Sequence, residues 1–459
     1  MNLSKNIIKE IQKISGVENI KISEADRYCY SYDATGRIFM PDAVVFPGSA
    51  GEISSILKLA TKYRFNVIPR GSGSGTTGGS VAVQGGVVLV LTRLNNIMNI
   101  DTDNLVAVAE TGVITADFHR AVESRGLFYP PDPSSSAFST LGGNLAECAG
   151  GPRAVKYGVT RDYVLGLKAV LPTGEIIKTG VQTAKGVVGY DLTKLIVGSE
   201  GTLAVITEMT LKLLPLPKHK KTMTAVFPKM HDAASAVSEI IRRGLVPSAV
   251  EYLDNAAIRC AEGYLKSGLP VDAGALLIIE SDGRTDSEAG TAIFELETAC
   301  RDCGASETKI AKTKEETENI WKARKALSPA VYQIAPDKIN EDIVVPRSKI
   351  PLMTEFLEKL SKDSGLAIVA FGHAGDGNIH VNVMLDKKDK IALGKAHKAV
   401  DDIFDYTLKL GGTISGEHGI GITKLDYMTK EIGPVEIKLM RDIKKAFDPA
   451  GILNPGKIF

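Results

Sequence analysis

Apolar residues recur in two different rhythms along the chain. Up to about residue 213 they form short runs separated by glycine and other turn residues, a pattern that predicts many strands and few helices. The strands expected there are residues 42–47, 66–69, 87–91, 105–110, 168–172, 176–179 and 203–213, and the helices are residues 52–63, 116–125 and a short helix capped by Asp191. Isoleucines at helical spacing also predict a helix within residues 1–17.

The second rhythm begins after residues 214–221 (LPLPKHKK), where two prolines and a basic run mark a boundary. Beyond this boundary, apolar strands alternate with long helical patterns. The expected strands are residues 223–227, 249–253, 275–280, 338–345, 367–371 and 379–384, and the helices are residues 286–301, 348–361, 388–410 and 435–447. Two unlike parts of this kind predict the α+β class.

The charge balance and the cysteines exclude several classes of protein. The 459 residues carry 55 Lys and Arg against 54 Asp and Glu, a net charge of +1, so nothing favours binding to nucleic acid or to a membrane surface. The apolar runs are far shorter than the ~20 residues of a membrane span, and no secretory signal pattern occurs, so we expect a cytoplasmic protein without a transmembrane segment. Five cysteines are too few for a disulfide framework, and Cys300-x2-Cys303 lacks the second pair that a metal site would need.

The densest motif is a glycine-rich stretch at residues 69–79 (PRGSGSGTTGG). Five glycines in nine residues let the backbone approach a ligand closely and point successive amides at it, as in a phosphate cradle. Its G-x-G-x-x-G match to dinucleotide-binding folds is weak, because residues 81–91 read as a strand where such folds need a helix, and the nearest acid is Asp101. A turn without a ligand is the alternative interpretation.

Further glycine-rich stretches follow at residues 130–136 (PPDPSSS), 140–144 (TLGGN), 150–151, 157–158 and 198–203 (GSEGTL). Several such loops spread over about 130 residues predict one extended ligand that is contacted at many points.

Three of the seven histidines lie in unusual surroundings, within residues 371–382 (FGHAGDGNIHVN) and 411–419 (GGTISGEHG). If residues 374–377 connect a hairpin, Phe371 lies opposite His380, and His373, His380 and Asn382 share one face. The two histidines are then diagonal neighbours at ~7–8 Å, close enough to bind one ion. A carboxylate from Glu417 would complete a set that suits zinc, manganese or ferrous iron. The residues alone leave a simple hydrogen-bonded pair equally open.

Residues 70–79, 131–151, 157–158 and 198–206 resemble the flavin-binding domain of the vanillyl-alcohol oxidase superfamily, the FAD-linked oxidases. The resemblance implies an N-terminal helical segment (residues 1–40), a PCMH-type FAD-binding domain (41–217) and an FAD-linked oxidase C-terminal α/β substrate and metal domain (218–459), α+β overall. A loop histidine often carries the flavin covalently in relatives, but Ser74 is near that place here and no histidine precedes His119, so we expect non-covalent FAD.

The residues expected to bind FAD follow from this resemblance. They are Arg70, Gly71, Ser72, Gly73, Ser74, Gly75, Thr76, Pro131, Asp132, Thr140, Gly142, Gly143, Asn144, Gly150, Gly151, Tyr157, Gly158, Glu200, Gly201 and Ile206.

His373-x6-His380 with Glu417-His418 resembles the C-terminal domain of the D-2-hydroxyacid dehydrogenases of this superfamily, which include D-lactate dehydrogenases, the glycolate oxidase flavin subunit and D-2-hydroxyglutarate dehydrogenase. The resemblance implies that His373, His380 and Glu417 hold a divalent metal and that His418 is the catalytic base. Residues 321–328 (WKARKALS) resemble a W-x-x-R segment whose arginine binds the substrate carboxylate, a task suited to its planar fork. The expected substrate-binding residues are Arg324, Ser328, Lys338 and Asn382.

The expected function is FAD-dependent oxidation of a D-2-hydroxy acid, D-lactate or glycolate, to the 2-keto acid, with hydride transfer to flavin N5. The family implies that electrons pass to an electron-transferring flavoprotein or to an iron–sulfur subunit, since one C-x2-C cannot supply the four thiolates of a cluster. D-2-hydroxyglutarate remains an alternative substrate. An oxygen-using alcohol or sugar oxidase fits less well, because the loop histidine is missing, and the intact histidine, glutamate and arginine set disfavours a relay flavoprotein.

Overall fold

A computed structural model describes residues 3–183 and 185–459, so residues 1 and 2 of the expected N-terminal segment lie outside it. The chain forms two compact units. Unit 1 comprises Met1–Ala149, Val159–Leu216 and Glu417–Phe459, and unit 2 comprises Gly150–Gly158 and Pro217–Gly416. Unlike the expected domains, unit 1 also includes the N-terminal segment and residues 417–459, and unit 2 also includes residues 150–158 and Pro217.

The first sheet of unit 1 has the strand order β1-β2-β4-β3. Its strands are β1 (Ile20–Lys21), β2 (Ala43–Val45), β3 (Val67–Arg70) and β4 (Val87–Val90). β2 and β3 pair in parallel with β4, and all of β2 and β4 is buried, which explains their unbroken apolar sequences. The glycine-rich loop leaves the carboxyl end of β3. Residues 81–86, expected to be extended, precede β4 rather than belong to it, and Gly85 and Gly86 there have φ of 68° and 107°.

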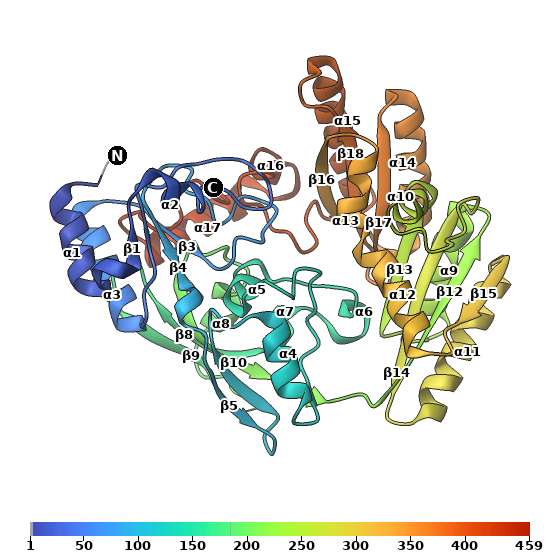
Figure 1. Ribbon diagram of the computed structural model, residues 1–459, viewed down its shortest axis with the longest axis horizontal. Coiled ribbons are helices and arrows are strands. Elements are labelled where there is room, and N and C mark those ends of the chain that lie inside the picture. Colours follow the sequence, from blue (N-terminus) through green and yellow to red (C-terminus); the bar gives the residue numbers. More distant parts are fainter. Residues whose placement is uncertain (1–2, 184) are drawn as a thin grey trace. The chain divides into compact units, whose positions relative to one another are not determined.

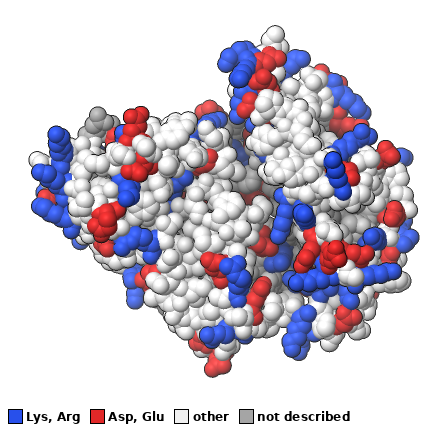
Figure 2. Space-filling model, viewed as in Figure 1, with Lys and Arg blue, Asp and Glu red and all other residues white. Residues whose placement is uncertain are grey.

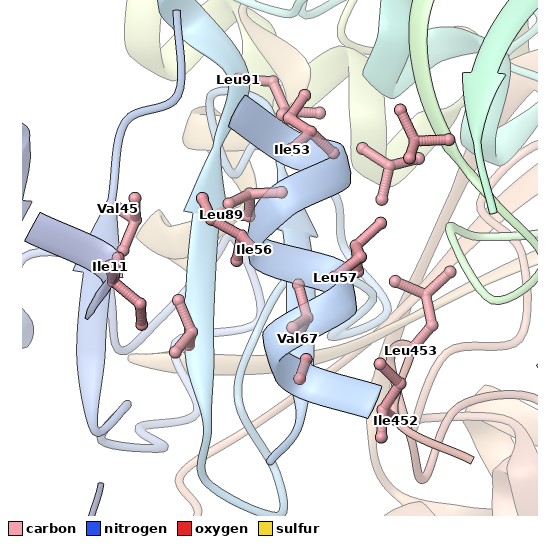
Figure 3. Close-up of a cluster of buried hydrophobic side chains, with 14 of the residues drawn as sticks. Ile11, Val45, Ile53, Ile56, Leu57, Val67, Leu89, Leu91, Ile452 and Leu453 are labelled. Carbon is pink, nitrogen blue, oxygen red and sulfur yellow. The ribbon is translucent and has the colours of Figure 1, made fainter. Parts of the chain in front are cut away.

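Helix α3 (Ala50–Tyr63) packs on this sheet through a stripe of apolar side chains. Ser49 caps the helix by accepting a hydrogen bond from the Glu52 amide at 3.2 Å. Ile53, Ile56 and Leu57 follow at helical spacing and are fully buried in the core of unit 1 (Figure 3).

The C-terminal end of the chain completes the same core. Ile452 and Leu453 are buried beside α3, and Leu453 pairs with Val67 of β3 as an isolated parallel bridge (Figure 3). The Lys444 ammonium donates to the Leu453 carbonyl and forms an ion pair with Asp448. Residues 417–459 therefore belong to unit 1 because their apolar side chains are part of its core.

The second sheet of unit 1 is antiparallel, with the order β5-β6-β10-β8-β9. Its strands are β5 (Ile97–Asp101), β6 (Val106–Glu110), β8 (Val164–Val170), β9 (Ile176–Gly180) and β10 (Val205–Lys212), and β7 (Leu127–Phe128) pairs separately with β11 (Leu214–Pro215). The other helices of unit 1 are α1 (Lys5–Ser15), α2 (Glu24–Tyr28), α4 (Thr115–Glu123), α5 (Leu141–Glu147), α7 (Thr160–Tyr163), α8 (Leu192–Ile196), α16 (Met428–Glu431) and α17 (Pro434–Phe447).

Unit 2 is built on an antiparallel seven-stranded sheet with the order β15-β12-β14-β13-β17-β18-β16 (Figure 1). The strands are β12 (His219–Phe227), β13 (Ala249–Asp254), β14 (Ala275–Gly283), β15 (Glu307–Ile310), β16 (Asp337–Val344), β17 (Ala367–His373) and β18 (Asn378–Leu385). The helices are α6 (Ala154–Tyr157), α9 (Met230–Arg242), α10 (Asn255–Leu265), α11 (Asp286–Asp302), α12 (Lys314–Lys325), α13 (Leu327–Ala330), α14 (Ile350–Ser364) and α15 (Lys390–Lys409). Short 3-10 helices across both units are Val17–Asn19, Leu91–Arg93, Val331–Gln333, Arg347–Lys349 and Leu425–Tyr427.

Strands β17 and β18 form the hairpin expected from the sequence. Phe371 pairs with His380, as predicted, and residues 374–377 connect the strands. Gly377 has φ of +91°, and a Cβ there would lie 2.1 Å from the Val345 carbonyl oxygen, so this turn requires glycine.

The surface carries no concentration of one charge over the face shown in Figure 2, where basic and acidic side chains are interspersed. Among the described residues, no helix has both the length and the apolar character needed to cross a membrane.

Candidate functional site

A pocket in unit 1 is built around the glycine-rich loop that follows β3. Its lining comes from the loop, from α5 and the segment before it, and from the ends of the second sheet. Predicted residues that line it are Arg70, Gly71, Ser72, Gly73, Ser74, Gly75, Thr76, Thr140, Gly142, Gly143, Asn144, Glu200, Gly201, Ile206, Glu417 and His418. Most of the expected cofactor-binding residues are thus gathered around one pocket.

The loop presents backbone amides that the chain itself does not use. Within the described residues, the amides of residues 72–76 donate to no other group, although the Gly75 carbonyl accepts from Ala34 at 3.1 Å. A row of unused amides in a pocket is suited to a phosphate or pyrophosphate group. The buried Ser199 hydroxyl and one Glu147 carboxyl oxygen in the same pocket also have no partner there. These residues fit FAD.

Arg70 supports the loop from within the protein. It is 6% exposed, and its guanidinium donates to the Tyr32 carbonyl at 2.8 Å and to the Ser80 carbonyl at 3.3 Å. Burial lowers the pKa of Arg70. Gly73 has φ of +71°, and a Cβ there would lie 2.1 Å from the Arg70 guanidinium, so glycine is needed for the loop to close over this arginine.

Helix α5 packs closely against the loop and the second sheet. Thr140 caps α5 by accepting from the Gly143 amide at 3.2 Å, and a Cβ on Gly71 would lie 2.3 Å from the same hydroxyl. A Cβ on Gly142 would lie 1.7 Å from the Thr111 hydroxyl. Glycines at positions 71 and 142 therefore let the loop, the helix and the end of β6 meet at the pocket.

The segment that carries Glu417 and His418 is fixed to this pocket by hydrogen bonds within unit 1. The Thr77 hydroxyl donates to the His418 carbonyl at 3.1 Å. The buried Glu200 carboxylate accepts from the Ile420 amide at 2.8 Å and from the Gly421 amide at 2.7 Å. Burial raises the pKa of Glu200, and these two amides partly offset that effect.

Glu147, beside Glu200, is a second carboxyl group of the pocket. Its pKa lies well above the ordinary value, because burial disfavours the charged form and because Glu200 is close. The sequence contains no spacing signal for this pair, so Glu147 was not predicted, and neither were Thr111 and Ser199.

The predicted histidine pair lies in unit 2 on β17 and β18. The ring centroids of His373 and His380 are 5.2 Å apart with nearly perpendicular planes, and each residue is 7% exposed. The Asp342 carboxylate lies 3.7 Å from His380 Nδ1, and its other oxygen accepts from the Gly416 amide at 2.9 Å. Asp342 and His380 are neighbouring groups of a kind that can bind a divalent transition metal.

The buried carboxylate of Glu251 joins Arg324 of α12 to His373. Its Nε donates to one oxygen of Glu251, and His373 Nδ1 lies 2.5 Å from the other. Burial alone would raise the pKa of Glu251, but the pKa is lowered because the charges of Arg324 and His373 outweigh burial. The guanidinium also lies over the Phe371 ring, 5.0 Å from its centroid.

The other predicted substrate-binding residues also belong to unit 2. Lys338 Nζ lies 3.3 Å from the Ser328 hydroxyl and over the Tyr332 ring, and burial lowers the pKa of Lys338 to about 8. Asn382 is fully buried on β18, where its amide nitrogen donates to the Val369 carbonyl at 3.4 Å.

Six predicted cofactor residues do not line the pocket of unit 1: Pro131, Asp132, Gly150, Gly151, Tyr157 and Gly158. The last four belong to the segment that packs with unit 2, where the Tyr157 hydroxyl donates to Asp282 at 2.7 Å and Lys156 pairs with the same carboxylate. Their cofactor role stays a prediction.

Two buried carboxylates of unit 2 were missed by the sequence reasoning. Glu251 on β13 and Asp342 on β16 are both fully buried. Glu251 stands within the apolar run of residues 249–253 (AVEYL), and because an unpaired charge is costly to bury, that position was a signal for a cationic partner. Asp342 stands among other polar residues (DKINEDIV) and gives no such signal.

Comparison with known families decides the identity of the fold. Residues 216–458 match the family described as FAD linked oxidases, C-terminal domain, and residues 41–180 match the FAD binding domain. The chain belongs to the FAD-linked oxidases. The predicted α+β fold, the FAD cofactor and the oxidoreductase class are therefore confirmed.

Relatives of this FAD-linked oxidase match nearly all of its length. The glycolate oxidase subunit GlcD of Bacillus subtilis (strain 168) is 44% identical, covering 100% of this chain and 97% of the relative. The D-lactate dehydrogenase of Anaerostipes hadrus is 36% identical (91% and 89%), and the glycolate oxidase subunit GlcD of Escherichia coli (strain K12) is 35% identical (96% and 89%). These matches confirm the predicted D-2-hydroxyacid branch.

Solved structures of two other proteins share the fold of this chain. p-Cresol methylhydroxylase aligns with a TM-score of 0.82 at 16% identity, covering 99% of this chain and 96% of the other. Alkyldihydroxyacetonephosphate synthase aligns with a TM-score of 0.76 at 22% identity, covering 99% and 86%. At such identities the likeness concerns the fold alone.

Proposed function

We propose that this FAD-linked oxidase oxidises a D-2-hydroxy acid, D-lactate or glycolate, to the 2-keto acid. The observation that carries the proposal is the buried cluster in unit 2 in which Glu251 joins the Arg324 guanidinium to the imidazole of His373. A 2-hydroxy acid offers a carboxylate for a guanidinium fork next to a hydroxyl for the histidine side of the cluster. The names of the relatives, glycolate oxidase subunit and D-lactate dehydrogenase, point to the same substrate class.

In this proposal, FAD is held non-covalently by the glycine-rich loop and by Gly142, Gly143 and Asn144 of α5. Bound FAD would supply the acceptor for the hydride that leaves the substrate Cα. Ser74 in the loop offers no imidazole for a covalent bond. Acid precipitation is expected to release all flavin into the supernatant, and flavin retained on the protein would contradict non-covalent binding.

A divalent metal ion, zinc, manganese or ferrous iron, is proposed to be held by His373, His380 and Glu417. It would lower the pKa of the substrate hydroxyl group. The perpendicular imidazoles of unit 2 and the Asp342 carboxylate beside His380 support this choice. Glu417 follows Gly416, the residue whose amide binds Asp342.

His418 is proposed to take the proton of the substrate hydroxyl group. A neutral imidazole is suited to accept a proton near neutral pH. The carbonyl of His418 is fixed by Thr77, so the backbone at the proposed base is held in place before substrate arrives. Arg324, Ser328, Lys338 and Asn382 are proposed to bind the substrate, with Arg324 at the carboxylate.

We further propose that electrons leave this cytoplasmic protein for an electron-transferring flavoprotein or an iron–sulfur subunit. The glycine-rich loop is assigned to FAD, which leaves NAD without a comparable loop in the sequence. Affinity purification from the native host is expected to recover one of these partners. Rapid stoichiometric reduction of NAD by the chain alone would contradict the proposal.

The substrate is tested with a panel of acids and an artificial electron acceptor. The panel contains D-lactate, L-lactate, glycolate and D-2-hydroxyglutarate. Turnover of D-lactate or glycolate with little turnover of L-lactate supports the proposal, and preferred turnover of D-2-hydroxyglutarate would instead select the alternative substrate. No turnover of any acid in the panel, together with stoichiometric hydrogen peroxide from sugars or simple alcohols assayed separately in air, would overturn it.

A further inference from the structure

Both oxygens of one buried carboxylate are engaged by two groups of the proposed site. Glu251 is fully buried on β13, directly opposite His373 of β17 in the antiparallel pair. One oxygen lies 2.5 Å from His373 Nδ1, and the other accepts from the Nε of Arg324, which comes from α12. Three separate elements of unit 2 therefore meet at this side chain.

The hydrogen bond from Arg324 Nε to Glu251 fixes the orientation of the guanidinium group. A guanidinium group is planar, so fixing Nε fixes the plane and direction of the two terminal nitrogens. Among the described residues, no hydrogen bond of the chain uses those terminal nitrogens. They are the nitrogens that bind a carboxylate as a bidentate fork.

The contact between His373 Nδ1 and Glu251 fixes the orientation of the imidazole ring. His373 Nδ1 lies at hydrogen-bonding distance from Glu251, and an ionised carboxylate only accepts hydrogen bonds, so an ionised Glu251 selects the tautomer with the proton on Nδ1. Nε2 is then the nitrogen whose lone pair is offered to a metal ion. A carboxylate behind a ligand histidine fixes the ring orientation and makes the ligand more basic.

We propose that Glu251 is a positioning residue that sets the substrate-anchoring fork of Arg324 and the ligand nitrogen of His373 with a single carboxylate. The proposal rests on the proposed function and names the residue that coordinates its two binding groups. Glu251 acts through Arg324 and His373.

A neighbouring carboxylate provides a matched control. Glu280 on β14 is also buried, and it accepts from the Trp321 indole of α12 at 3.2 Å and from the Thr222 hydroxyl at 3.3 Å. It binds the same helix as Glu251 but contacts neither Arg324 nor His373. A purely structural role in docking α12 would be shared by both glutamates.

The test compares Glu251→Gln with Glu280→Gln in the FAD-loaded full chain. A glutamine at 251 directs an amide N–H at one of two donors, so it can keep only one of the two contacts. We expect FAD content to be unchanged, KM for the 2-hydroxy acid to rise about 10-fold or more, and zinc affinity to fall about 10- to 100-fold. Glu280→Gln is expected to lower the unfolding temperature and to leave KM and zinc affinity within about twofold of wild type.

Two further measurements separate positioning from misfolding. Binding of oxalate to the metal-free protein, followed by the flavin spectrum without turnover, is expected to weaken in Glu251→Gln. In an Arg324→Lys background, Glu251→Gln is expected to change KM less than in wild type, because the fork it orients is already gone. If Glu251→Gln fails to fold, Glu251→Asp replaces it, since the shorter side chain keeps the charge but cannot span both partners.

Failure of this proposal is distinguishable from failure of the proposed function. If wild type oxidises no 2-hydroxy acid, the proposed function fails whatever the variants do. If wild type oxidises one and Glu251→Gln matches it in KM, oxalate binding and zinc affinity, the positioning role is overturned. The positioning role would also be overturned if Glu251→Gln and Glu280→Gln changed KM and zinc affinity equally, and if the effects of Glu251→Gln and Arg324→Lys on KM were additive in the variant that carries both.

Discussion

Two buried carboxylates, Glu251 and Asp342, contact the proposed substrate- and metal-binding residues of unit 2. Glu251 and Asp342 are buried carboxylates on strands β13 and β16, and each lies beside a histidine of the β17–β18 hairpin. Burying an unpaired carboxylate is costly, so Glu251 and its hydrogen-bonding partners Arg324 and His373 hold one another in defined positions. The same pairing gives Arg324 and the two histidines fixed geometry before any ligand binds.

Arg324→Lys is expected to raise KM for the 2-hydroxy acid about 10-fold or more, with a smaller effect on kcat. Lysine carries the charge but has neither the planar fork nor an Nε–H for Glu251. Steady-state kinetics with an artificial acceptor measure this. Lys325→Arg, at an exposed position of the same helix, is the control and should leave both constants unchanged. An unaltered KM in Arg324→Lys would remove Arg324 from the substrate site.

His418→Ala is expected to lower kcat by about 100- to 10,000-fold, the usual range for loss of a general base. FAD should be retained, because the contact of this residue with Thr77 is made by its backbone carbonyl. The exposed His397 of α15 offers a control, His397→Ala, that should turn over like wild type. Normal turnover by His418→Ala would require another base.

Asp254 is expected to make the stability of unit 2 depend on pH. Burial raises its pKa to about 7, although the carboxylate accepts from the Ala257 and Ala370 amides. In the unfolded chain this pKa returns to about 3.9, so between these values the folded state holds about one extra proton. The free energy of unfolding then falls as pH rises, by at most roughly 1.4 kcal/mol per pH unit from this residue.

The Asp254→Asn variant isolates that contribution. The unfolding temperature of wild type relative to Asp254→Asn is expected to be higher at pH 5 than at pH 8, because asparagine does not titrate. Thermal unfolding at several pH values measures the difference. A difference that is constant from pH 5 to pH 8 would show that Asp254 has an ordinary pKa.

At the scale of elements, strands were predictable where apolar patterns and turn residues agreed. The β17–β18 hairpin, including the pairing of Phe371 with His380, followed from alternation and a glycine turn. Helix α5 was missed because Gly142 and Gly143 disfavour a helix in isolation. Its formation depends on the Thr140 cap and on packing against Thr111, which local sequence does not show.

Gly142→Ala is expected to weaken FAD binding by about 10-fold or more and to lower stability. A Cβ there would lie 1.7 Å from the Thr111 hydroxyl, so α5 must move away from the pocket. The control is Gly290→Ala in α11, where no atom lies within 4 Å of the added Cβ. That change should leave FAD affinity unchanged and stabilise the helix by about 0.5–1 kcal/mol. Equal FAD affinity in both variants, measured by titrating the apoprotein, would contradict the packing described for α5.

At the scale of the whole molecule, the sequence predicted two parts but not which segments belong to each. Residues 417–459 follow the second part in sequence, yet Ile452 and Leu453 are buried in the core of unit 1. Apolar periodicity shows that a segment is buried but does not identify its partner. The same limit applies to the candidate site: its motifs were visible in the sequence, whereas Glu147 and Glu251, isolated acids without a spacing pattern, required the tertiary structure.

Removal of the proposed metal ion is expected to stop turnover without removing FAD. The proposed metal-binding residues His373 and His380 belong to unit 2, whereas the third proposed ligand, Glu417, lines the pocket of unit 1. A chelator is expected to abolish turnover and to leave FAD bound, because the glycine-rich loop and Gly142, Gly143 and Asn144, which are proposed to hold FAD, are not metal ligands. Zinc, manganese or ferrous iron should restore turnover. Full activity in a preparation shown to be metal-free would exclude the metal.

The central claim is that this chain alone transfers a hydride from a 2-hydroxy acid to its flavin. The most direct measurement adds D-lactate or glycolate to the FAD-loaded chain without oxygen, without a partner protein and without another reductant. The account predicts rapid loss of the absorbance of oxidised flavin, in proportion to the acid consumed. Flavin that stays oxidised with every 2-hydroxy acid, but is bleached by a chemical reductant, would contradict it.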